Sequence, residues 1–410
     1  MNLSSSSSRL KLPQLFSSID SSVSKLSSLV RDLEEKDRIA KLPLIGITPR
    51  PTHSAFNKKC SKTTVLFKTI FSAVKSGDVT VLQSLFNSQA DDDIKVNPSF
   101  LCSIVNKKRQ NLLHLGCLYN QVGVLKFFAS FSASHASVVA PLLSAFDINS
   151  HLPLHYAVIS GNSALFSAFS VVFRDTSQHL DAILIGNAGN SEGFGALHLA
   201  FQHVKLFEQS QEDLTLSSKD DLRLDILDTL INEYNCSPNK RDTKLRTPLH
   251  HLVMGSFPHQ TKVLLKFLDF DPLVDIEDCY HQTPILYAIK NRNFDCISIL
   301  LGKGKADPNY IHKRRGNLLN MAVESGCLEA VKLLVQHGAD PKLCDFLSWS
   351  PLHECVFNSN ISPRHSNRKR HRDYIEIANY LIDCGCSMSD RGRFNTIPLK
   401  MAVCNSFKLL

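Results

Sequence analysis

Long hydrophobic runs are missing from this chain of 410 residues, since no apolar stretch reaches the ~18 residues that span a bilayer. The opening residues, MNLSSSSSRLKLPQLF, also lack the continuous apolar core of a secretory signal. Glycine and proline are scarce, at 17 each, which excludes collagen-like and Pro/Gly-rich low-complexity proteins. We therefore expect neither membrane insertion nor secretion, and we expect the twelve cysteines to be reduced thiols of the cytoplasm or nucleus.

Recognisable catalytic motifs are missing as well. The sequence contains no HExxH, G-x-S-x-G or CxxC pattern. The tetrapeptide at His371–Tyr374, HRDY, is similar to a kinase catalytic loop, but Ala378 stands where that loop requires asparagine. Cys355 and Cys386 occupy small positions of the repeat described below, which argues against a zinc site. We expect no enzymatic activity, no small-molecule substrate, no cofactor and no metal.

The first 65 residues differ from the rest, because twelve of the first thirty are serine and large apolar groups are too few for a core. We expect residues 1–65 to form a largely disordered arm with one amphipathic helix near 16–40. Apolar residues in this helix alternate at spacings of 3 and 4. Two interpretations are open: the helix packs within its own molecule, or residues 16–33 pair two molecules in a weak self-association. The apolar positions are Phe16, Ile19, Val23, Leu26, Val30 and Leu33.

From residue 66 onward the sequence repeats a short block similar to Leu-His-x-Ala. Successive blocks are 33 to 52 residues apart, so a basic unit of about 33 residues carries insertions of different length. One such unit cannot bury its apolar face alone and does so by stacking on its neighbours. The blocks are LLHLGC at 112–117, PLHYAV at 153–158, ALHLAF at 196–201, PLHHLV at 248–253, PILYAI at 284–289, LLNMAV at 318–323, PLHECV at 351–356 and PLKMAV at 398–403.

These blocks resemble the ankyrin repeat, in which a turn, two antiparallel helices and a β-like finger recur every ~33 residues. The clearest copy is NLLNMAVESGCLEAVKLLVQHGADPK at 317–342. The resemblance implies an all-α solenoid over residues 66–410, with about eight units and a partial unit at the carboxyl end. Thr247 and Asn317 suit the N-cap of a first helix, and Pro248 and Pro284 suit its first helical position.

One position of the block forms a column in which five of nine residues are histidine. This is the preference of the ankyrin family, where the imidazole hydrogen-bonds neighbouring turns. Leu286, Asn320 and Lys400 stand at the same position, which fits a structural role and no chemical one. We therefore expect the histidines to hold the stack together. They are His114, His155, His198, His250 and His353.

Two insertions are longer than the others, and we expect both to emerge as loops. The one near 208–221 is acidic, whereas the one near 361–372 holds five Arg and Lys residues and accounts for much of the net charge of +8. The basic segment is either a solvated loop, a nuclear localisation signal, or a docking patch for an acidic partner. Its basic residues are Arg364, Arg368, Lys369, Arg370 and Arg372.

A second set of cations falls at the predicted fingers between units. The family resemblance implies that fingers line the concave surface on which partners bind. Some Lys and Arg is ordinary in solvated fingers, so two interpretations are open: plain solvation, or an acidic peptide or protein bound along this surface. The residues are Lys107, Lys108, Arg109, Lys240, Arg241, Lys244, Arg246, Lys313, Arg314 and Arg315.

The resemblance thus predicts a non-catalytic scaffold or adaptor that binds other proteins in the cytoplasm, with the nucleus as a second compartment. Two alternatives are open. The last repeat stops after one helix at Leu410, which fits the regulatory arm of a larger enzyme or channel. A substrate-recruiting subunit of a ubiquitin ligase is the other, although no adaptor-binding box follows the repeats. Nucleic acid is not an expected partner, because no stacking aromatics accompany the basic residues.

Overall fold

The computed structural model describes most of the repeat region of the protein. The predicted arm, residues 1–65, and its helix near 16–40 lie outside the described residues. The protein divides after Thr64 into two units, and the second, Val65–Leu410, contains all described residues. These are 67–86, 98–202, 216–255, 260–312, 316–345, 348–361, 368–392 and 395–404.

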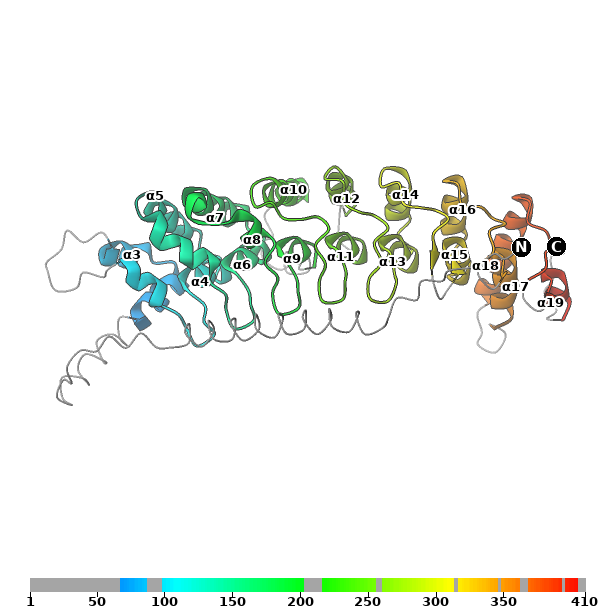
Figure 1. The fold of residues 1–410 in the computed structure, drawn as a ribbon, viewed down its shortest axis with the longest axis horizontal. Coiled ribbons are helices and arrows are strands. Elements are labelled where there is room, and N and C mark those ends of the chain that lie inside the picture. The colour runs from blue at the N-terminus through cyan, green and yellow to red at the C-terminus, as the bar shows by residue number, and fades with distance from the viewer. Residues whose placement is uncertain are drawn as a thin grey trace, which may run out of the picture. The chain divides into compact units, whose positions relative to one another are not determined.

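Within the second unit the described residues form successive helix pairs, in which a first helix leads into a second helix that packs beside it (Figure 1). The first helices coincide with the repeated blocks. They are α4 (Leu112–Leu118), α6 (Pro153–Ser160), α9 (Ala196–Gln202), α11 (Pro248–Met254), α13 (Pro284–Lys290), α15 (Leu318–Glu324), α17 (Pro351–Ile361) and α19 (Pro398–Cys404). The second helices are α3 (Val79–Phe86), which follows a helical stretch at 67–76, α5 (Val122–Ser144), α7 (Ser163–Thr176), α10 (Leu216–Asn232), α12 (Gln260–Leu268), α14 (Phe294–Gly302), α16 (Leu328–Gln336) and α18 (Arg368–Asp383).

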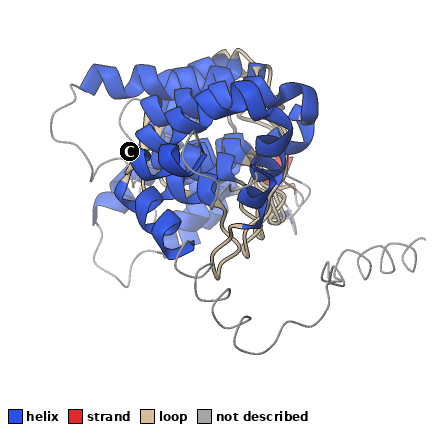
Figure 2. Ribbon diagram, turned by 90° about the vertical axis from the view of Figure 1, so that its left-hand side faces the viewer, coloured by secondary structure: helices blue, strands red, loops and turns tan. Residues whose placement is uncertain are grey.

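Few other elements occur in the described residues. Two 3-10 turns, η1 (Pro98–Ser103) and η2 (Ser177–His179), and the short helix α8 (Ala182–Gly186) lie between helix pairs. A two-stranded antiparallel ladder pairs β1 (Ile311–His312) with β2 (Gly316–Asn317). The loops that connect the pairs gather along one side of the helices (Figure 2). The prediction of an all-α repeat fold is confirmed.

The core lies between the two rows of helices and runs from one pair to the next. Each first helix packs on the following first helix, as α11 does on α13 and α13 on α15. Second helices pack on one another in the same way, as α12 does on α14. Leu249, Leu252, Ile285 and Leu300 are at most 1% exposed in these contacts. The stack therefore buries apolar surface that a single helix pair would leave exposed to water.

The start of each first helix follows local chemistry. The Oδ1 atom of Asn317 accepts the backbone N–H of Asn320 at 2.7 Å, and Asn111 accepts that of His114 at 3.1 Å. These caps satisfy N–H groups that have no partner within the helix. Proline at the first helical position, as in Pro153 at the start of α6, has no N–H to leave unpaired.

Helix α5 stands out because, among the described residues, it alone is long and apolar enough to cross a membrane by length and composition. It bends at His135, whose φ and ψ are −131° and 39°, and it contains Pro141. Leu125 and Phe128 are fully buried, and the helix packs along α7 and η1. Packing inside the repeat stack thus accounts for its apolar composition.

The expectation that both long insertions form loops is wrong for part of each. Residues 216–221 of the acidic segment belong to α10, and Arg368–Arg372 of the basic segment open α18. Lys, Arg and Leu are good helix formers, so each second helix extends backward into its insertion. In α18 the buried Tyr374, Ile377 and Leu381 continue the helical period that anchors this extension. Residues 203–215 and 362–367 lie outside the described residues.

Candidate protein-interaction surface

Five fingers, the segments that lead into a first helix, are shaped by an Asp or Asn five residues before the helix begins its first turn at the N-cap. In the finger before α11, Asp242 Oδ1 accepts the N–H groups of Lys244 and Arg246, both at 2.8 Å. In the finger before α13, Asp278 makes the same two bonds, at 2.8 Å and 2.9 Å. A carboxylate or amide oxygen that bonds two N–H groups closes the finger into a tight turn. The residues that do so are Asn106, Asp147, Asn190, Asp242 and Asp278.

The third residue after this Asp or Asn has a positive φ in every one of these fingers. Leu245, for example, has a φ of 59° and is 44% exposed. A left-handed residue reverses the direction of the backbone, so the residues up to the reversal form an outward fingertip. The residues with positive φ are Arg109, Ser150, Gly193, Leu245 and His281, and, later in the sequence, Ser348 and Asn395.

Four histidines of the column tie their first helices to the following finger. His250 Nε2 lies 3.0 Å from the backbone O of Gln282, and its Nδ1 accepts the N–H of Thr247 at 3.1 Å. His114, His198 and His353 make the same bridges to the next finger, at 3.0–3.2 Å. The structural role predicted for the column is therefore seen in these four residues, whereas the buried Nε2 of His155 makes no hydrogen bond.

These imidazoles are held neutral. Burial lowers the pKa of His155 to about 3 and the pKa of His198 and His250 to about 4. Burial also lowers the pKa of His114 and His353. In the histidines that form the bridges, Nδ1 accepts a backbone N–H, so the single ring proton sits on Nε2, where it is donated to the next finger. The histidines of the column therefore have a structural role, and their lowered pKa values do not suit them to acid–base catalysis near neutral pH.

A lateral network joins two neighbouring fingers through the second carboxylate oxygen of Asp278. Asp278 Oδ2 accepts Tyr287 OH at 2.6 Å and Arg246 Nε at 3.2 Å. Arg246 Nη2 also donates to Tyr287 OH at 3.0 Å, and its guanidinium lies 5.8 Å from the ring centre of Tyr280. Burial opposes ionisation of Asp278, but these donors outweigh it and leave its pKa lowered. These bonds hold the finger before α11, the finger before α13 and the helix α13 together.

The predicted finger cations fall into two groups in the structure. Lys107, Lys108 and Arg109 form the tip of the finger before α4, and Lys244 belongs to the tip before α11; all four are exposed. No carboxylate among the described residues forms an ion pair with them. Their charges are therefore available to a partner at the fingertips.

The other described finger cations are placed differently. The Lys240 ammonium donates to the backbone O of Asn187, and burial lowers its pKa. Arg246 belongs to the Asp278 network, whereas Arg241 is exposed one residue before Asp242. Sequence spacing alone could not separate these roles, because all of them lie within one short finger.

The remaining predicted basic residues have no described side chains. Lys313, Arg314 and Arg315, together with Arg364, lie outside the described residues. The side chains of Arg368, Lys369, Arg370 and Arg372 are likewise outside the description, although these residues belong to α18.

Sequence reasoning missed the apolar part of this surface. Ile148 and Tyr280 are 63% and 59% exposed at two fingertips. Leu118 and Phe357, in the second halves of α4 and α17, are both 46% exposed. The ring of Phe357 meets the finger residue Trp349 edge-on at 5.9 Å, so this part of α17 lies on the finger side. A signal existed for the two helix residues, since Leu118 and Phe357 each directly follow the repeated block. We call the fingertips and these exposed first-helix residues the finger face.

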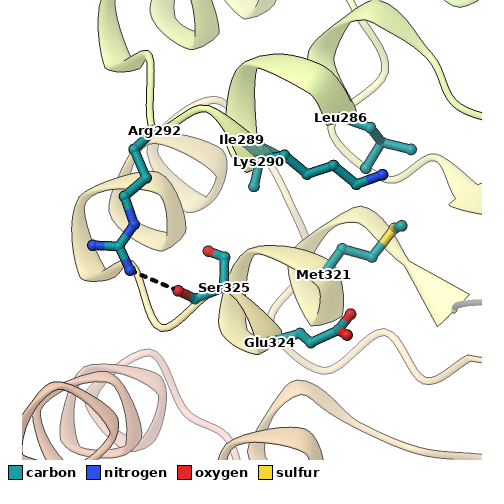
Figure 3. Close-up of a pocket in the computed structure, with 7 residues that line it drawn as sticks. All are labelled: Leu286, Ile289, Lys290, Arg292, Met321, Glu324 and Ser325. Carbon is teal, nitrogen blue, oxygen red and sulfur yellow. Dashed lines mark hydrogen bonds between the residues drawn. The ribbon is translucent and has the colours of Figure 1, made fainter. Parts of the chain in front are cut away.

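A pocket of about 320 Å³ lies between α13 and α15 on the finger face (Figure 3). Its floor is made by Leu286, Ile289 and Met321, none more than 5% exposed. Lys290 and Glu324, both exposed, stand on its two sides. Lys290 also donates to the finger residue Gln282, which places the pocket beside the finger before α13.

Metal-binding groups are not assembled in the part of the protein that the structure describes, where no three His, Cys, Asp or Glu side chains come together as a ligand set. Burial raises the pKa of the thiols of Cys355 and Cys386, in the second case to about 12. Their sulfurs donate to the backbone oxygens of Tyr374 and Pro341. Both residues fill small positions of the stack.

The geometry defines a class, a stack of helix pairs with projecting fingers. Comparisons of the sequence with known families and proteins agree with it. Family models for ankyrin repeats match residues 214–312 and 319–382. The sequence is 33% identical over 118 residues to an ankyrin repeat protein of fowlpox virus (strain NVSL), covering 28% of this chain and 79% of that protein. It is 32% identical over 125 residues to the transient receptor potential channel pyrexia of Drosophila melanogaster, covering 30% of this chain and 13% of the channel. The crystal structure of the ankyrin repeat domain of Bcl-3 aligns with 62% of this chain and 94% of its own, at 20% identity and a TM-score of 0.47.

The chain belongs to the ankyrin-repeat family. Ankyrin repeats are protein–protein interaction modules, so the described part of the protein is an interaction domain. The similarity spans about an eighth of the Drosophila channel's length.

Proposed function

We propose that this protein is a non-catalytic scaffold or adaptor whose finger face binds a partner protein with an acidic surface. The exposed cations Lys107, Lys108, Arg109 and Lys244 supply the charge that steers such a partner. Exposed apolar fingertip residues such as Tyr280 supply contact area. Because the network at Asp278 and the histidine column brace the fingers, the surface loses little conformational entropy on binding.

The observation that carries this proposal is the charge at the tip of the finger before α4. Lys107, Lys108 and Arg109 are three successive exposed cations, and the residue at the finger aspartate position beside them is the neutral Asn106. A fingertip that served only to close the turn would need none of these charges, since Asn106 closes it through backbone N–H groups.

Reversing this fingertip charge is expected to weaken partner binding about tenfold or more. In Lys107→Glu/Lys108→Glu an acidic partner meets two like charges. The measurement is affinity capture with the full chain followed by quantitative mass spectrometry, and the captured partner should also dissociate from the wild type as salt rises.

The matched control is Lys126→Glu/Lys262→Glu, which makes the same change in net charge at exposed lysines of the second helices α5 and α12. It should retain the partner. Equal capture by the fingertip and control variants would show that net charge, and not the finger face, governs binding, and would end this assignment.

A second candidate is that the chain is the regulatory arm of a larger enzyme or channel. The similarity to part of the Drosophila channel favours it. Sequencing of the transcript decides the matter: coding sequence for a catalytic or membrane-spanning domain in the same reading frame supports this candidate, and its absence from the whole reading frame contradicts it.

A further inference from the structure

We propose that the pocket between α13 and α15, the α13–α15 pocket, receives one uncharged apolar side chain from an extended segment of the partner protein. The inference rests on the proposed function and deepens it, because it names the site and chemistry of one anchor. Three features of the pocket support it: its lining, the bracing of its rim, and its position beside a fingertip.

The lining selects the occupant. The floor of the pocket is apolar and is made by Leu286, Ile289 and Met321. Burial of an apolar side chain against it is favourable in proportion to the apolar area removed from water. Lys290 and Glu324 bring opposite charges to the two sides, and Figure 3 shows both side chains at the pocket. A charged side chain would lose its hydration against this apolar floor, so the anchor is uncharged.

The same two charges suit a peptide backbone. A backbone carbonyl accepts from an ammonium and a backbone N–H donates to a carboxylate, and an extended segment presents both on either side of one residue. Lys290 and Glu324 therefore match the polar atoms next to the anchor and fix its direction. A small apolar molecule would offer neither polar group to them.

The rim is held in place before any partner arrives. Arg292 Nη2 donates to the backbone O of Ser325 at 2.9 Å and joins the ends of α13 and α15 (Figure 3). From the other side, Tyr374 OH of α18 donates to the backbone O of Glu324 at 3.0 Å. A preformed pocket binds with little ordering cost.

The pocket also lies beside a fingertip. Lys290 donates to Gln282, which directly follows the left-handed His281 of the finger whose tip carries the exposed Tyr280. The pocket and this fingertip are therefore neighbours on the finger face. A segment of a few residues can fill the pocket and reach the Tyr280 ring together, so a peptide suits this site better than an isolated small molecule does.

The experiment uses a phage-displayed library of random dodecapeptides, selected on the full chain. We expect the selected peptides to share one apolar residue, and to lose about tenfold or more in affinity for Ser325→Trp, which fills the pocket, and for Lys290→Glu. The matched control is Asn291→Trp, at an exposed residue of the same helix end that does not line the pocket. It should bind the peptides as the wild type does. Circular dichroism confirms that each variant is folded.

Three results would overturn the inference. Peptides that bind Ser325→Trp as tightly as the wild type do not use the pocket. Peptides that lose affinity only for Lys107→Glu/Lys108→Glu would support the finger face as the interaction surface while removing the pocket from it. A selection without any specific peptide would show that the pocket does not hold an extended segment, whereas the capture experiment with whole partner proteins would still test the proposed function.

Discussion

Acidification from about pH 7 to pH 5 is expected to destabilise the repeat stack before the finger aspartates are protonated. The unfolded protein binds protons on histidine near the ordinary pKa of 6.5, whereas His198 and His250 bind them only near a pKa of about 4 when folded. The depressed pKa therefore contributes fully to the free energy of unfolding above about pH 6.5. This contribution is lost as the pH falls toward 4, because the unfolded state binds protons that the folded state does not. Each of these two histidines then removes about 3 kcal/mol from the free energy of unfolding.

The aspartates of the fingers act in a separate range. The pKa of Asp147, Asp242 and Asp278 is lowered from 3.8, so the stability that they contribute is lost only below about pH 4. Urea unfolding followed by circular dichroism at about pH 7, 6 and 5 therefore isolates the histidine effect. A free energy of unfolding that stays constant over this range would refute the assignment of neutral, buried imidazoles.

The protein supplies its own control for this prediction. Asn320 occupies the column position in α15, and its Nδ2 donates to the backbone O of Trp349 at 3.1 Å, as the histidines donate to their fingers. His250→Asn should therefore keep the bridge to Gln282 but lose the titration. We expect a smaller loss of stability between pH 7 and 5 than in the wild type. His250→Leu, which copies Leu286, should instead be less stable by about 1–3 kcal/mol at pH 7.

The histidine column shows which features could be predicted from the sequence and which could not. The repeat block predicted the helix pairs, the caps and the structural role of His114, His250 and His353, because these depend on local spacing within one unit. The actual acceptors, such as the backbone O of Gln282 for His250, lie in the next finger. The Asp or Asn that shapes five of the fingers was overlooked, although its distance from the N-cap is the same in all five.

Gly186→Ala is expected to destabilise the protein by about 3 kcal/mol or more. A Cβ atom at Gly186 would lie 2.0 Å from the backbone O of Tyr234 and 3.1 Å from Cys236 Sγ. The backbone there cannot retreat, because Tyr234 is fully buried and Asn187 Nδ2 holds the O of Asn235 at 2.8 Å. The measurement is the midpoint of urea or thermal unfolding at pH 7.

The control is Gly302→Ala at the end of α14. There the nearest atom to a new Cβ is His337 Cε1 at 3.7 Å, which is ordinary van der Waals contact. Alanine loses less backbone entropy on folding than glycine, so this variant should match or exceed the wild type by about 0.5–1 kcal/mol. If both variants unfold at the same midpoint, the close approach of α8 to the loop at Tyr234 is not as the structure has it.

Features that depend on contact between distant units could not be predicted. The helix α8 arises in a connection whose extra length was visible, but its contact with Tyr234 required the fold. Likewise, Lys240 and Lys244 lie four residues apart in one basic finger, yet one bonds inward to Asn187 and the other is exposed. The exposed apolar residues at the fingertips, such as Ile148 and Tyr280, were also hidden, because an apolar residue in a repeat is by default assigned to the core.

Site-specific photo-crosslinking in cells tests the central claim, that the finger face is the surface on which partner proteins bind. A photoreactive amino acid replaces Ile148 or Tyr280 at the fingertips, and, as controls, Val171 of α7 or Leu265 of α12, each 39% exposed on a second helix. We expect the same partner protein to be crosslinked from both fingertip positions and from neither control. Crosslinks to partner proteins from Val171 and Leu265 alone would contradict the claim.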